Sequence, residues 1–96
     1  MKTIHITKNA LWRREGAGIV ILEEASGEPY HLDGISAEIF EFLSGGPSFE
    51  AIVERQIEEY QGEEETIRDD LEEFLFALLE LSLIEVRGGA SEESEG

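Results

Sequence analysis

The amino-terminal third of the chain alternates between apolar and polar positions, which predicts short strands. Ile4 and Ile6 share one face of an extended segment that is either a strand or an arm. The β-branched run GIVILEE, from residue 18, predicts the strongest strand, and the turn residues Ala25, Ser26 and Gly27 follow it. The extended segments predicted in this way are residues 3–7, 10–14, 18–24, 28–32 and 83–86.

From residue 33 onward, apolar residues recur every three or four positions, which predicts three helices. Ser48 is a suitable N-cap for the second helix, and three consecutive glutamates from Glu63 suit the positive end of the third helix dipole. The predicted helices run from residue 33 or 36 to 43, from 48 to about 60, and from 63–66 to 81.

Strands precede helices along the chain, so the predicted fold class is α+β. The expected architecture is winged helix-turn-helix-like, with a three-stranded antiparallel sheet followed by three helices. Residues 1–87 are predicted to form one domain. Residues 88–96, GGASEESEG, have no large apolar side chain to bury and are predicted to be a disordered acidic tail.

Pro29 lies within the strand predicted over residues 28–32. Because proline cannot donate to a sheet ladder, this strand is predicted to lie at an edge of the sheet. Tyr30, His31 and Leu32 are expected to keep donors that an added peptide strand could use. The alternative is an edge that is merely tolerated, with Pro29 and nearby charges opposing aggregation.

The chain is strongly acidic, with 23 acidic and seven basic residues and a net charge of −16. Residues 50–96 carry 16 acidic and three basic side chains, so the acidity is concentrated in the second half. Such a field disfavours nucleic acid and anionic membrane and favours a basic partner. The amino-terminus lacks the apolar run of a signal peptide, so we expect a cytoplasmic location.

Catalytic and metal-binding patterns are absent from the sequence. There is no cysteine, and neither His5 nor His31 has a second histidine at a metal-ligand spacing. Phosphate-binding loops and nucleophile motifs are missing. The paired acids of the third helix are expected on its solvent-exposed face. We therefore expect neither an enzyme nor a bound cofactor or metal.

The third helix has an apolar arc, centred on Leu71, that is wider than a single core face requires. This width favours a partly exposed groove, with a self-associating surface as the alternative. A winged-helix DNA-binding protein would need a basic recognition helix, whereas Arg55 and Arg68 are each surrounded by acids. Transcriptional regulation and a structural homodimer remain the alternative functions.

Several stretches, taken in order, resemble the PqqD-like family, the RiPP recognition elements that serve ribosomal peptide-modifying systems. Gly27, Tyr30 and Leu32 match the family's Gly-x-x-Tyr-x-Leu segment, with Asp33 where asparagine is usual. Ser82 stands where glycine is common. The other matching stretches are residues 18–22, 36–43, 48–60 and 70–83, and the resemblance spans residues 12–85.

The resemblance implies a non-catalytic peptide chaperone for natural product biosynthesis. The leader segment of a precursor peptide would pair antiparallel with the third strand, against the third helix, and be presented to a modifying enzyme. That enzyme would be either a radical SAM protein or the leader peptidase and cyclase of a lasso peptide pathway. The implied peptide-binding residues are Glu28, Pro29, Tyr30, His31, Leu32, Asp69, Asp70, Glu73, Phe74 and Ala77.

The side of the third helix that faces the peptide is left open by the sequence. The opposite side, with Arg68, Glu72, Phe76 and Leu79, is the alternative. Phe76 and Ala77 replace residues that are typically polar in the family, which indicates either an enlarged peptide groove or an interface with an enzyme partner.

Overall fold

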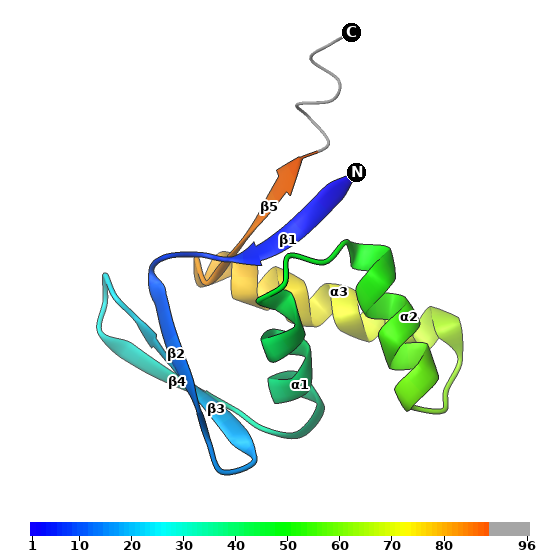
Figure 1. Cartoon of the computed structure of the whole chain (residues 1–96), viewed down its shortest axis with the longest axis horizontal. Coiled ribbons are helices and arrows are strands. Elements are labelled where there is room, and N and C mark those ends of the chain that lie inside the picture. The colour runs from blue at the N-terminus through cyan, green and yellow to red at the C-terminus, as the bar shows by residue number, and fades with distance from the viewer. Residues whose placement is uncertain (89–96) are drawn as a thin grey trace, which may run out of the picture.

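The computed structural model describes residues 1–88, and the predicted tail lies outside the described residues except for Gly88, which ends the last strand. The fold contains a three-stranded sheet, three helices and a separate two-stranded ribbon (Figure 1). In chain order the elements are β1 (Lys2–Ile6), β2 (Ala10–Glu15), β3 (Gly18–Glu23), β4 (Glu28–Leu32), α1 (Gly34–Leu43), α2 (Phe49–Glu59), α3 (Glu64–Glu80) and β5 (Ile84–Gly88).

The three-stranded sheet has the order β2-β3-β4 and is antiparallel throughout, which confirms the predicted α+β fold. β3 is the central strand, and its alternating pattern buries Ile19 and Ile21. Gly18 is required by close packing at the end of β4, because a Cβ at this position would lie 2.5 Å from the carbonyl oxygen of Leu32. A residue with a side chain at position 18 would therefore displace the end of β4 that leads into α1.

β1 and β5 form a second antiparallel sheet of their own, which rises above the helices in Figure 1. Their register runs from Lys2 opposite Gly88 to Ile6 opposite Ile84. The Thr7 amide donates to the Leu83 carbonyl at 3.0 Å and anchors the ribbon to the turn after α3. The sequence predicts both strands but not their pairing, because hydrophobic alternation does not specify a partner.

One hydrophobic core joins the sheet, the helices and the ribbon. Phe40 is fully buried in its centre, and the Trp12 ring packs edge-on against it with centroids 5.5 Å apart. The other core residues with the least exposure are Ile19, Ile21, Ala37, Leu43, Ile52, Val53, Leu71 and Leu83.

The helix ends follow local sequence signals. The Ser48 hydroxyl accepts the Ala51 amide at 3.1 Å, which confirms Ser48 as the N-cap of α2. At the other end of the helical region, Ser82 has a φ of 63° in the turn between α3 and β5. This left-handed conformation favours glycine, so a serine here carries backbone strain.

Candidate functional site

β4 is an open strand edge, as Pro29 predicts. Among the described residues, β4 pairs with β3 on one side and with no strand on the other. An edge of this kind presents unpaired backbone groups that an extended peptide can bind.

The backbone groups that face outward from β4 follow from the pairing of its neighbour. The Glu24 amide donates to the Asn9 carbonyl at 2.8 Å, so the even-numbered residues of β3 direct their backbone groups towards β2. Because these groups alternate along a strand, Ile19, Ile21 and Glu23 direct theirs towards β4. Their partners in β4, which therefore use their backbone groups to pair with β3, are Glu28, Tyr30 and Leu32.

Pro29 and His31 consequently point their backbone groups away from β3. The missing N–H of Pro29 falls on this outer side, so proline leaves the ladder between β3 and β4 intact. His31 is then the one residue of β4 that offers both a donor and an acceptor to an added strand. The expectation that Tyr30 and Leu32 also offer donors is wrong, because their amides face β3.

The side chains of β4 divide between two faces. Tyr30 and Leu32 are half-buried and pack against the core, whereas Glu28, Pro29 and His31 are exposed. A strand added beside His31 would therefore place alternate side chains next to an apolar inner face and a solvent-facing outer one.

One flank of α3 faces α1, close to the end of β4. Asp70 and Phe74 line a cavity of about 220 Å³ together with Ile35 and Ser36 of the first turn of α1. Only Asp33 separates β4 from α1. Ile35 and Ser36 were not among the predicted site residues. Ile35 is 47% exposed.

The remaining predicted residues of α3 lie further round the helix. Ala77 is exposed and lies one turn beyond Phe74 on the same side. Asp69 and Glu73 project from the side of α3 opposite the buried Leu71, so they face solvent and line neither flank. Of the predicted helix residues, Asp70 and Phe74 are therefore the two that share a cavity with α1.

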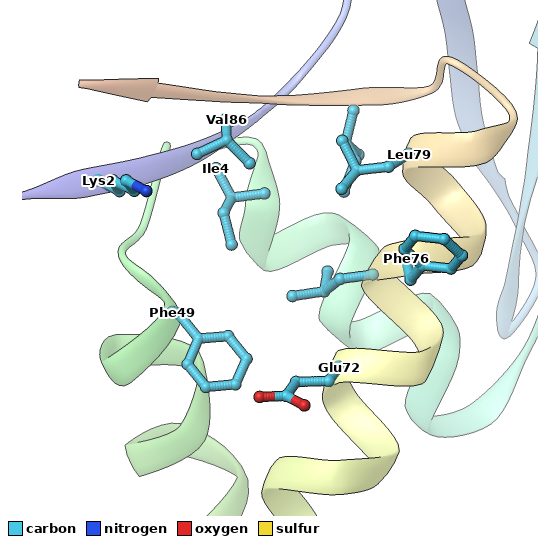
Figure 2. A pocket seen from close by; sticks show the side chains of 9 residues that line it. Lys2, Ile4, Phe49, Glu72, Phe76, Leu79 and Val86 are labelled. Atoms are coloured by element: carbon cyan, nitrogen blue, oxygen red, sulfur yellow. The ribbon is translucent and has the colours of Figure 1, made fainter. Parts of the chain in front are cut away.

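The other flank of α3 lines a second, apolar groove, which Figure 2 shows from close by. Phe76 and Leu79 face Ile4 and Val86 of the β1–β5 ribbon across it, and Phe49 from α2 closes one end. The structure therefore assigns the two sides of α3 to different neighbours. Only the Asp70 and Phe74 side lies next to the helix that begins after β4.

The two arginines of α2 and α3 are held by acids, which bears on the DNA-binding alternative. The Arg68 guanidinium donates to Glu50 at 2.7 Å and to Glu64 at 2.9 Å, and these bonds raise its pKa and lower that of Glu50. Arg55 lies 3.7 Å from Glu59 and stacks over the Phe42 ring. Neither side chain is free to form a basic recognition surface.

Within residues 1–88, no three acidic or histidine side chains are grouped in a way that could hold a metal ion. No helix in the described part of the chain is long and apolar enough to cross a membrane.

An open strand edge beside a helix flank, on a small α+β scaffold, is the architecture of a domain that accepts an extended peptide. Residues 18–84 match the family described as coenzyme PQQ synthesis protein D (PqqD), and the chain belongs to this family. Comparison with curated proteins found no match.

Two solved structures share this fold across nearly their whole length. One, described as TbiB1 in complex with the TbiA(beta) leader peptide, is 28% identical with a TM-score of 0.80 and covers 84% of this chain and 94% of its own. The other, lasso peptide synthetase B1 complexed with the leader peptide, is 22% identical with a TM-score of 0.77 and covers 85% and 96%.

Proposed function

We propose that this protein binds the leader segment of a ribosomally made precursor peptide along β4 and presents it to a peptide-modifying enzyme. The observation that carries the proposal is the open edge of β4, where the His31 N–H and C=O face outward. The two similar structures support it, because each is a protein solved with a leader peptide.

In the proposed complex the leader runs antiparallel to β4 and exchanges a pair of backbone hydrogen bonds with His31. Side chains on the inner face of the leader pack against Tyr30, Leu32 and Phe74, which are half-buried and already contact the core. Apolar burial of this kind contributes about 25 cal/mol per Å² and supplies affinity that a few edge hydrogen bonds cannot.

The charges of α3 add a preference for a basic leader residue. Asp70 lines the cavity beside Phe74, so it is the acid best placed to contact the bound strand. Asp69 and Glu73 face solvent and act at longer range by attracting basic peptides to the helix. Ala77 extends the wall of the site beyond Phe74 without blocking it.

We further propose that the domain itself does no chemistry and that the modifying enzyme supplies it. Both similar structures come from leader-binding proteins, one of them a lasso peptide synthetase component, which favours a leader peptidase and cyclase as the partner over a radical SAM protein. Transcriptional regulation is not favoured, because Arg55 and Arg68 are paired with acids. A purely structural homodimer is not favoured, because the two similar structures were each solved with a leader peptide.

A matched pair of variants at one position tests the proposal. His31→Pro removes the only amide of β4 that faces outward, whereas His31→Ala removes the imidazole and keeps that amide. Calorimetric titration with the synthetic leader of the precursor encoded beside this gene should show about tenfold or greater loss for His31→Pro. His31→Ala should bind within about threefold of wild type.

Circular dichroism should show that both variants fold, because the His31 amide takes no part in the β3 ladder. Equal affinities of the two folded variants would contradict strand addition at β4.

A further inference from the structure

The groove on the second flank of α3 is an apolar surface that the proposed leader site does not use. It has a volume of about 310 Å³ and lies between α3, the start of α2 and the β1–β5 ribbon (Figure 2). Three of its side chains are substantially exposed: Phe76 at 62%, Val86 at 47% and Leu79 at 40%. Large apolar side chains gathered in this way are typical of interaction sites.

Phe76 is the most exposed aromatic residue of the described chain, and acidic residues surround it on the helix surface. On a helix, its neighbours are the residues three and four positions away, which are Glu72, Glu73, Leu79 and Glu80. None of these three glutamates has an ion-pair partner within residues 1–88, so their charges are available to a partner. The surface combines an aromatic anchor with an acidic rim, whose complement is an apolar surface with a basic rim.

Lys2 is the one cation that lines this groove among the described residues, and it lies at the ribbon end, away from Phe76 (Figure 2). Arg68, one turn before Glu72 on α3, is paired with Glu50 and Glu64 instead. A partner with lysine or arginine side chains on this side would gain attraction without displacing an existing ion pair.

The position of the groove allows two partners to bind at the same time. Asp70 and Phe74 line the flank that faces α1, whereas Phe76 and Leu79 line the flank that faces the ribbon. A leader strand seated on β4 leaves the second flank uncovered. A domain that presents a peptide to an enzyme needs such a second surface, because it must hold both partners in one complex.

A second copy of the chain is a poor occupant for this groove. Each copy carries a net charge of −16, and pairing the two acidic rims around Phe76 would bring like charges together. Repulsion of this kind opposes a symmetric dimer, in which the same patch faces itself.

We infer that this groove, with Phe76 as its anchor, is the docking site for the peptide-modifying enzyme, through an apolar patch on that enzyme bordered by basic side chains. The inference rests on the proposed function, since it assigns a place to the enzyme partner. It predicts a complex in which leader and enzyme contact opposite flanks of α3.

The test measures binding of the purified modifying enzyme encoded beside this gene to the full chain saturated with synthetic leader peptide. Phe76→Ala and Leu79→Ala should each weaken enzyme affinity, about tenfold or more for Phe76→Ala, and leave leader affinity unchanged. Ile57→Ala is the matched control for Leu79→Ala, because Ile57 on α2 is equally exposed at 40% and lies outside the groove. It should bind the enzyme like wild type.

Charge neutralisation gives a second, independent readout. Glu72→Gln combined with Glu80→Gln should slow association with the enzyme and flatten its dependence on salt concentration. Since both side chains are exposed, these substitutions should not disturb the fold.

Four results would overturn the inference. They are no enzyme binding by wild type, unchanged enzyme affinity in Phe76→Ala, loss of leader affinity in Phe76→Ala, and concentration-dependent dimers in sedimentation that Phe76→Ala abolishes. Failure of the proposed function gives a different result, because the wild-type chain would then bind the enzyme through this groove but not the leader.

Discussion

The two flanks of α3 differ in what the fold places beside them. Asp70 and Phe74 face the start of α1, the helix that follows β4 and its open edge after one residue. Phe76 and Leu79 face the β1–β5 ribbon across a groove lined by apolar side chains.

In our proposal, this difference gives one helix two kinds of recognition. A strand edge binds the backbone of a partner and therefore suits an extended peptide, whose own backbone is unpaired. A groove of side chains suits a folded surface whose shape and charge match it. The same 17-residue helix can thus serve a peptide on one side and a protein on the other.

The largest expected effect distinguishes the two faces of β4 itself. Tyr30→Pro removes an amide that faces β3 and a side chain that packs on the core, so it should destabilise the fold by at least about 3 kcal/mol. In a domain this small, such a loss leaves much of the chain unfolded. Chemical denaturation followed by circular dichroism measures it.

His31→Pro is the control, because it removes an outward amide only and should retain most of its stability. A stable Tyr30→Pro variant would show that the assignment of inner and outer amides is reversed.

The next largest effect is on leader affinity, which should depend on one flank of α3 and not on the other. Phe74→Ala should weaken leader binding about tenfold, since the half-buried ring lines the cavity between α3 and the start of α1 in which the leader is proposed to pack. Phe76→Ala, two residues away on the same helix, should leave leader binding unchanged. Calorimetric titration with synthetic leader measures both. Equal losses in the two variants would mean that the flanks do not act separately.

A smaller effect is expected in the turn that joins α3 to the ribbon. Ser82→Gly should stabilise the protein by about 0.5–1 kcal/mol, because glycine relieves the strain of a positive φ. Ser44→Gly is the matched control, since Ser44 has an ordinary helical φ of −63° and should lose stability when replaced. Thermal unfolding of both variants measures the difference, and a lower melting temperature for Ser82→Gly would disprove the strain.

The smallest effect concerns acid sensitivity on the ribbon side. Arg68 contacts Glu50 and lies over the Phe49 ring, and its hydrogen bonds hold the pKa of Glu50 below the ordinary glutamate value. A lowered pKa in the folded state means that Glu50 stabilises the fold above the ordinary pKa, and that this contribution is lost as the pH falls through the lowered value.

Glu50→Gln should therefore be slightly less stable than wild type at neutral pH, and the two should converge in acid. Melting temperatures across the pH range measure this convergence. A difference in melting temperature between wild type and Glu50→Gln that grows as the pH falls would contradict the lowered pKa of Glu50.

Much of this fold can be predicted from local sequence signals. Pro29 is sufficient to place β4 at an edge, and the Ser48 cap follows from residue type alone. The apolar periodicity also predicts the three helices correctly. These features depend on short-range chemistry, which a single sequence contains.

The features that could not be predicted from the sequence depend on packing between segments that are distant along the chain. The pairing of β1 with β5 joins the two ends of the described chain. The direction of the amides in β4 depends on the register of β3 with β2, so Tyr30 and Leu32 could not be distinguished from His31. The side of α3 that faces the peptide was left open by the sequence because it depends on how α1 packs. The place of Ile35 and Ser36 in the cavity has the same cause.

Amide hydrogen exchange at His31 tests the central claim most directly. In the free protein the His31 amide should exchange faster than those of Tyr30 and Leu32, which face β3. Saturation with synthetic leader peptide should slow exchange at His31 strongly and change the other two little, as a backbone hydrogen bond to the added strand requires. Fast exchange at His31 in the fully bound protein would contradict strand addition along β4.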